Sequence, residues 1–121
     1  MSVAYACVLA AALLPYVFTG IAKWSSDFDN RVPREYLSRL SGYRQRAHWV
    51  QLNAFETFPV FAAGVIIAQQ RGAAQARIDA LALAFVAARA LYGVCYLADL
   101  ATARTLVWLA SMGLIVALFF A

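Results

Sequence analysis

Charged residues are scarce in this sequence. Only 13% of its 121 residues are Asp, Glu, Lys or Arg, against about 25% in soluble globular proteins. Hydrophobic residues make up 64%, well above the roughly 45 to 50% of a soluble domain. This composition excludes an ordinary soluble protein and predicts one that lies in the lipid bilayer.

Cysteine and histidine are scarce as well. Cys7 and Cys95 are the only cysteines and form no CxxC pair, so we predict neither a disulfide framework nor a thiol-redox motif. His48 is the only histidine, and without an acidic or thiol cluster beside it we expect no metal site. The net charge of +4 comes without a phosphate-binding loop, and we expect no nucleic-acid partner.

Long apolar runs are what the sequence has in abundance. Each approaches or exceeds the about 20 residues that cross a hydrocarbon core of about 30 Å. The runs are Ser2 to Ala22, Trp49 to Gln69, Ile78 to Ala98 and Thr105 to Ala121. The first has no basic leading end and is too long for a signal peptide, so we expect it to be retained.

We therefore predict an all-α integral membrane protein with an up-down bundle of four transmembrane helices. The expected helices are residues 2–22, 47–69, 78–99 and 104–121 of a single domain, 1–121. Pro33 favours a further short helix in the first loop, with Asn30 or Arg31 just outside it and Leu37 and Leu40 on one face.

Basic residues gather in one loop, and this predicts the orientation of the chain. The first loop contains Lys23, Arg31, Arg34, Arg39, Arg44 and Arg46, the second only Arg71 and Arg77. Positive residues stay in the cytoplasm, so we expect a multi-pass protein of the cell (inner) membrane with its first loop cytoplasmic and both termini outside. The three tryptophans then lie at the cytoplasmic boundary, as amphipathic rings prefer.

Two of the apolar runs contain a charge at membrane depth. Insertion of Glu or Arg at the centre of a membrane helix costs about 2.5 to 3.5 kcal/mol, so such residues are usually paired or functional. Glu56 lies ten residues after Arg46, and Arg89 ten residues before Asp99, so both lie about 15 Å from the same membrane face. A structural Glu56–Arg89 pair that fixes the helix register is one interpretation.

The spacing of neighbouring polar residues suggests a second interpretation. Intervals of three, four and three residues place each group on one helix face. The groups are Arg46, Trp49, Asn53 and Glu56, and Arg89, Tyr92, Tyr96 and Asp99. We expect both stripes to face inward and to form a cytoplasm-facing cleft for a small anion with carboxylates. Pro59 should kink its helix and free the carbonyl of Phe55.

These residues resemble a family, the membrane-associated proteins in eicosanoid and glutathione metabolism (MAPEG). The similarity lies in Asn53, Glu56 and Pro59, spaced NxxExxP after a "RAH" segment, in "RALYGVCY", and in Arg104 at the start of the last helix. It implies a homotrimer of four-helix subunits that binds glutathione between subunits, near the cytoplasmic side. It further implies a lipophilic small molecule as second substrate.

The resemblance also implies roles for individual residues. It implies that Asn53 and Glu56 hold the peptide part of glutathione, with Glu56 accepting from the amino group. Tyr92 and Tyr96 resemble a pair of tyrosines that contact the tripeptide. It implies that Arg89 binds a carboxylate or orients the glutamate, and that Arg104 is the catalytic residue that stabilises the thiolate.

The sequence departs from the family pattern at two places. Trp49 stands where the family carries an arginine four positions before the asparagine, and Arg46, one turn earlier, is the nearest basic residue that could bind glutathione in its place. Seven residues separate Tyr96 from Arg104, one more than expected.

Three functions fit the sequence. The first is a glutathione-dependent transferase or peroxidase that acts on lipophilic electrophiles from the bilayer. The second is a non-catalytic trimer that binds a thiol, a lipid or another membrane protein. The third is a small proton-coupled exporter with Glu56 as proton carrier, although its cationic substrate would be repelled by Arg89 and Arg104.

Overall fold

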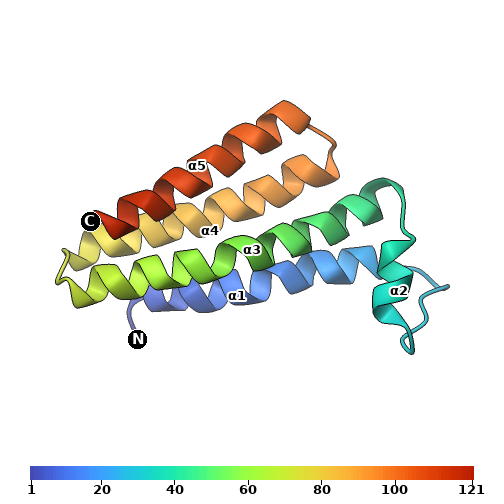
Figure 1. The fold of residues 1–121 in the computed structure, drawn as a ribbon, viewed down its shortest axis with the longest axis horizontal. Coiled ribbons are helices and arrows are strands. Elements are labelled where there is room, and N and C mark those ends of the chain that lie inside the picture. The colour runs from blue at the N-terminus through green and yellow to red at the C-terminus, as the bar shows by residue number, and fades with distance from the viewer.

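Four long helices and one short helix make up the structure, a computed structural model that describes residues 1–121. The long helices are α1 (Val3–Ala22), α3 (Gly42–Gln70), α4 (Gln75–Leu97) and α5 (Ala101–Phe119), and the short one is α2 (Pro33–Ser38). The long helices run alternately up and down, and both termini lie at the end of the bundle opposite α2 (Figure 1). All four are long and apolar enough to cross a membrane, which confirms the expected set of spans.

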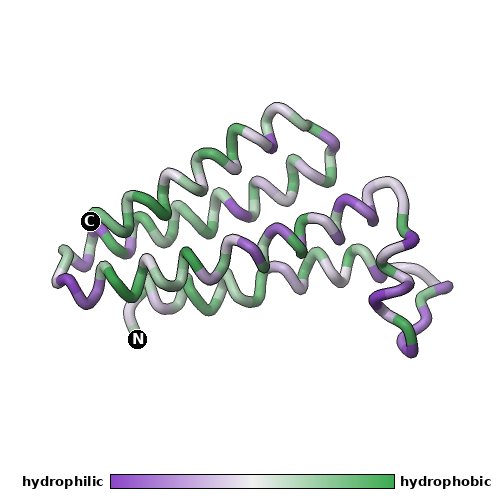
Figure 2. The backbone as a smooth tube through the Cα atoms, viewed as in Figure 1, coloured by the Kyte–Doolittle hydropathy of each residue, from purple (hydrophilic) through white to green (hydrophobic).

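Hydropathy follows this arrangement. Most of the length of the four helices is hydrophobic, whereas hydrophilic segments lie at the α2 end, on the neighbouring part of α3, and at the turn between α3 and α4 at the opposite end (Figure 2). Helix α3 begins at Gly42, earlier than the expected residue 47, and has 29 residues. At 1.5 Å per residue it is about 43 Å long, so its first turns extend beyond a core of about 30 Å.

The short helix α2 lies in the first loop, as Pro33 predicted. Pro33 stands in its first turn, but the residue outside it is Val32 and not Asn30 or Arg31. Leu37 is buried against the apolar cluster at this end of the bundle. Helix α2 is thereby fixed to the long helices.

Hydrogen bonds also tie the first loop to α1 and α3. The Tyr36 hydroxyl donates to Asp27 Oδ1 over 2.8 Å and accepts from Arg44. Hydrogen bonds with Ser25 and Tyr36 hold the pKa of the Asp27 carboxyl below its ordinary value of 3.8. A lowered pKa means that these interactions stabilise the loop above that value and are lost as the pH falls through the pKa of the folded state.

The interior contains two apolar clusters. One surrounds Phe61 and Phe85, whose rings stack with centroids 3.9 Å apart, toward the end that carries the termini. The other contains Phe18, Val50 and Tyr92 and lies toward α2. Helix α1 packs on α3 and α4, and α5 packs on the same two helices.

The contact between α1 and α4 depends on a glycine. A Cβ atom at Gly93 would lie 2.0 Å from Cζ of Phe18 and within 3 Å of two further atoms of its ring. Real Cβ atoms are not found at such distances, so only glycine fits while the two helices keep their spacing. This contact brings α1 against the part of α4 that carries the candidate site.

Arginine side chains cap the C-terminal ends of neighbouring helices. Arg44 Nε donates to the Ala22 carbonyl at the end of α1 over 3.1 Å, Arg46 Nη2 donates to the Leu97 carbonyl at the end of α4 over 3.1 Å, and Arg71 donates to the Phe119 carbonyl at the end of α5. The last carbonyls of a helix lack internal partners and carry partial negative charge. These arginines therefore stabilise the bundle at both membrane faces.

The turn between α4 and α5 places Asp99 in the left-handed backbone region, with φ of 60°. The Leu100 amide donates to the Cys95 carbonyl over 2.9 Å and the Asp99 amide to the Tyr96 carbonyl over 3.1 Å, the pattern of a helix end with one left-handed residue. Between α3 and α4 the equivalent residue is Gly72, with φ of 73°. Aspartate at this position costs free energy that glycine avoids.

Asp99→Gly should therefore stabilise the protein. We expect the free energy of unfolding to rise by about 1 kcal/mol, and Asp99→Ala, which keeps a Cβ but loses the polar group, to lower it. Thermal unfolding in detergent measures both changes. A glycine variant less stable than the wild type would show that the Asp99 side chain, and not its backbone, holds this turn together.

Candidate functional site

The candidate site lies where α3, α4 and α5 meet near the α2 end. Arg89 of α4 is only 4% exposed, and its Nη2 donates to Oδ1 of Asn53 on α3 over 2.5 Å. Its Cζ atom lies 4.2 Å from the centre of the Tyr92 ring. Guanidinium groups are attracted to aromatic faces at this distance, so the amide and the ring together fix the position of Arg89.

The same series of contacts continues to the start of α5. The Tyr92 and Tyr96 rings meet edge to face with centroids 5.6 Å apart, and Arg104 Cζ lies 4.4 Å from the Tyr96 ring centre. The Trp49 ring lies 6.2 Å from Tyr96. The consecutive helices α3 and α4 thus bring their polar side chains to one region, with Arg104 of α5 beside them.

Arg104 lines two adjacent pockets. One, of ≈ 250 Å³, is formed by Asn53, Tyr92, Arg104, Thr105 and Trp108. The other, of ≈ 170 Å³, is formed by Arg46, Trp49, Cys95, Tyr96, Asp99, Leu100, Ala101 and Arg104. A cation, an amide and phenol hydroxyls around these hollows can bind a small anionic molecule.

Five of the lining residues are absent from the set that the sequence predicted: Cys95, Leu100, Ala101, Thr105 and Trp108. Trp108 follows Arg104 by four residues and so lies on the same face of α5. That spacing could have identified it. For Thr105, next to Arg104 in sequence, the spacing contains no such signal.

Glu56 does not pair with Arg89. It is exposed on the outer side of α3 and forms neither of the two salt bridges in the chain. Helix geometry explains the difference, because three residues turn the helix by about 300°, or 60° short of a full turn. That rotation carries Glu56 from the position of Asn53 away from the buried residues Val50 and Thr57. The partner of Arg89 is Asn53 instead.

A family model for the MAPEG family matches residues 3–121. The chain belongs to the MAPEG family. No curated protein and no solved structure matches the chain significantly. The family and the four spans together make it a multi-pass membrane protein.

In this MAPEG protein Arg46 lies at the site, but its side chain already donates a hydrogen bond to the end of α4. Its Nη2 is bound by the Leu97 carbonyl, while its Nε is buried without a partner. Arg46 also lines the same pocket as Trp49. The sequence predicted its position near the site but not its contact with the end of α4.

The outer face of α3 in this MAPEG protein contains unsatisfied polar groups at membrane depth. Helix α3 continues through Pro59, which has no N–H to donate to the Phe55 carbonyl. Glu56, Phe55 and Pro59 are all exposed. Polar groups in lipid need partners, so this face requires contact with water, a ligand or another polypeptide chain.

Proposed function

We propose that this MAPEG protein binds glutathione beside Asn53, Tyr92 and Arg104 and joins it, through its sulfur, to a lipophilic electrophile that reaches the site from the bilayer. The observation that supports this most is the position of Arg104. It is a cation on the wall of two adjacent pockets, held against the face of Tyr96. Electrophile and thiol could therefore meet next to a fixed positive charge.

The chemistry of glutathione suits these groups. The tripeptide has two carboxylates, an amino group and a thiol. Arg104 beside the sulfur would favour the thiolate, which is the nucleophilic form. The Asn53 amide and the tyrosine hydroxyls would bind the peptide, and Glu56 would accept from the amino group. In the transfer step the thiol first releases its proton to water. The thiolate sulfur then forms a bond to the electrophilic carbon, and the leaving group departs with the electron pair of its bond.

We further propose that the active form is a homotrimer. A pocket of ≈ 250 Å³ is smaller than the roughly 300 to 1,000 Å³ of most ligand sites, so one chain encloses glutathione incompletely. Glu56 lies on the exposed side of α3, where a second copy would cover it. A neighbouring subunit on this face would enlarge the site and shield the carboxylate from lipid.

We place the α2 end at the cytoplasmic side of the inner membrane. The loop at this end and the first turns of α3 carry most of the basic residues, and positive residues stay in the cytoplasm. The candidate site lies at the same end, so it would open toward the compartment that holds glutathione.

Conjugation of glutathione to an aryl halide by the detergent-purified protein tests the proposal. We expect a saturable rate above the uncatalysed one. Glu56→Gln should weaken glutathione binding about tenfold, equivalent to about 1.4 kcal/mol. It should leave the thermal midpoint of the separated subunit unchanged, because Glu56 is exposed there and forms no salt bridge. Glutathione titration of both proteins measures the change. Wild-type protein without a rate above background, and with no glutathione binding, would contradict the proposal.

A second function, binding without turnover, has one observation in its favour. Trp49 cannot supply the charge of the arginine that resembling enzymes carry, and Arg46 already donates to Leu97. If the purified protein binds glutathione saturably but conjugates none, the non-catalytic function is the correct one.

A further inference from the structure

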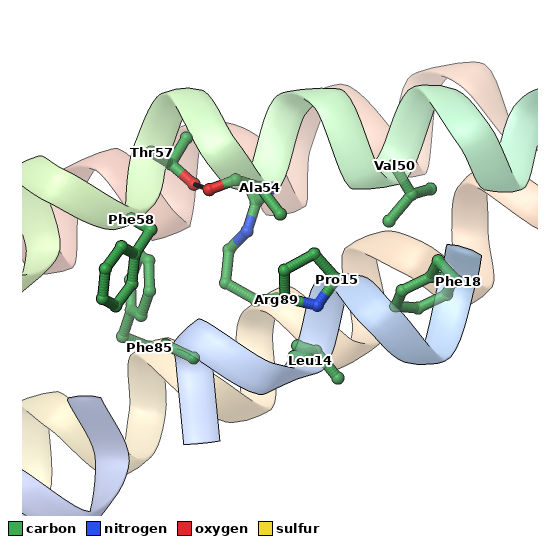
Figure 3. A pocket seen from close by; sticks show the side chains of 10 residues that line it. Leu14, Pro15, Phe18, Val50, Ala54, Thr57, Phe58, Phe85 and Arg89 are labelled. Carbon is green, nitrogen blue, oxygen red and sulfur yellow. Dashed lines mark hydrogen bonds between the residues drawn. The ribbon is translucent and has the colours of Figure 1, made fainter. Parts of the chain in front are cut away.

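A small pocket lies inside the bundle, between α1, α3 and α4, on the far side of Arg89 from α5. Its ten lining residues include Ala11, Pro15, Ala54, Thr57 and Arg89, and seven of the ten are hydrophobic. Figure 3 shows the Arg89 side chain extending from α4 toward Ala54 on α3. The free volume is ≈ 10 Å³, about the least that can hold one water molecule.

Arg89, which lines this pocket, has one guanidinium nitrogen without a partner. Arg89 Nη2 donates to Asn53, whereas Nη1 is buried and forms no hydrogen bond. A buried charged donor that stays unpaired strongly destabilises a fold. Among the side chains of the pocket, no carboxylate is present to satisfy it.

Two acceptors belong to the same pocket. Pro15 lies inside α1 and has no N–H, so the Ala11 carbonyl four residues earlier loses its usual helical donor. Thr57 Oγ1 donates to the Ala54 carbonyl over 3.3 Å and keeps its own lone pairs free. Donor and acceptors therefore come from three different helices, α4, α1 and α3.

We propose that this pocket is a binding site for a single water molecule. The water accepts a hydrogen bond from Arg89 Nη1 and donates to the Ala11 carbonyl and to Thr57 Oγ1. Three bonds are the usual number for a buried water. The water thereby connects α1 to Arg89, whose other terminal nitrogen donates to Asn53. The hydrogen bond that Pro15 removes from α1 leaves a carbonyl free to help hold Arg89 in place.

A pair of variants of equal shape tests the site. Ala11→Val fills the pocket with methyl groups and leaves Arg89 Nη1 unpaired, whereas Ala11→Thr has the same shape and carries a hydroxyl that can accept from it. We expect the threonine variant to unfold roughly 5 °C or more above the valine variant in detergent. In a dry apolar pocket the order would be reversed, because a hydroxyl costs free energy there.

The matched control is Ala10, the neighbouring residue of α1, which is exposed. Ala10→Thr should be no more stable than Ala10→Val, since no unpaired donor faces that position. Equal midpoints for the two Ala11 variants, or a more stable valine variant, would overturn the proposal.

An experimental structure that resolves ordered water gives a direct result even if both Ala11 variants fail to fold. One isolated density peak within hydrogen-bond distance of Arg89 Nη1 and the Ala11 carbonyl supports the site. A collapsed pocket with Nη1 bound to a protein group, or elongated density from a lipid chain, overturns it.

Discussion

Arg104→Ala should lower kcat/KM for glutathione conjugation by about 100-fold, equivalent to about 2.7 kcal/mol of transition-state stabilisation. Arg104 is the cation between the two pockets, and we assign it the stabilisation of the thiolate. Arg104→Lys keeps the charge without the planar group that packs on Tyr96 and should retain an intermediate rate. Steady-state kinetics with an aryl halide provides the values.

The pH dependence of this loss separates charge stabilisation from a structural effect. A nearby cation lowers the pKa of a thiol, so in Arg104→Ala the thiolate of bound glutathione should form only at higher pH. The deficit should therefore be largest near neutral pH and shrink as the pH rises. Arg77→Ala, which removes an exposed charge near the start of α4, is the control. A deficit that is constant with pH, or is shared by Arg77→Ala, would contradict this role of Arg104.

Gly93→Ala should destabilise the bundle by about 3 kcal/mol or prevent its folding. The added methyl would overlap the ring of Phe18, and overpacking of this kind typically costs about 1 to 3 kcal/mol. Because Phe18 is buried between α1 and α4, its ring cannot move aside freely. Denaturation in detergent, or the yield of folded protein, measures the effect.

Gly113→Ala is the matched control for this contact. It lies in α5, with no atom within 4 Å of the added Cβ, so we expect no loss and a gain of up to about 1 kcal/mol from the better helix former. In a Phe18→Leu background Gly93→Ala should cost less than in the wild type, because the obstructing ring is gone. An equal cost in both backgrounds would show that the α1–α4 spacing does not depend on this contact.

The spans and the inner face of α4 could be predicted from sequence because their physical causes are local. Apolar runs of about 20 residues predict helices that cross the bilayer, and intervals of three and four residues place side chains on one helix face. Arg89 and Tyr92 do lie on such a face, in contact and buried. The residues that match the family pattern lie mostly in α3 and α4, so the family could be predicted from the same part of the sequence.

The partners of these residues could not be predicted, because they depend on how the helices pack. Asn53 and Glu56 differ by 60° around α3, and only the placement of α4 decides that the first binds Arg89 and the second faces outward. Likewise, Arg46 caps Leu97 because the end of α4 lies beside the start of α3. The role of Pro15 could not be predicted either, because only the structure shows that Ala11, Pro15 and Arg89 line one pocket.

An even number of crossings has a practical consequence for assembly. Met1 and Ala121 both lie at the end away from α2 (Figure 1), so the tail of one copy and the head of the next are on the same membrane surface. A flexible polar linker could fuse the three copies of the proposed trimer into one polypeptide without an additional span. Such a concatemer would allow a substitution to be introduced into one, two or all three repeats, and so count how many intact sites the assembly needs.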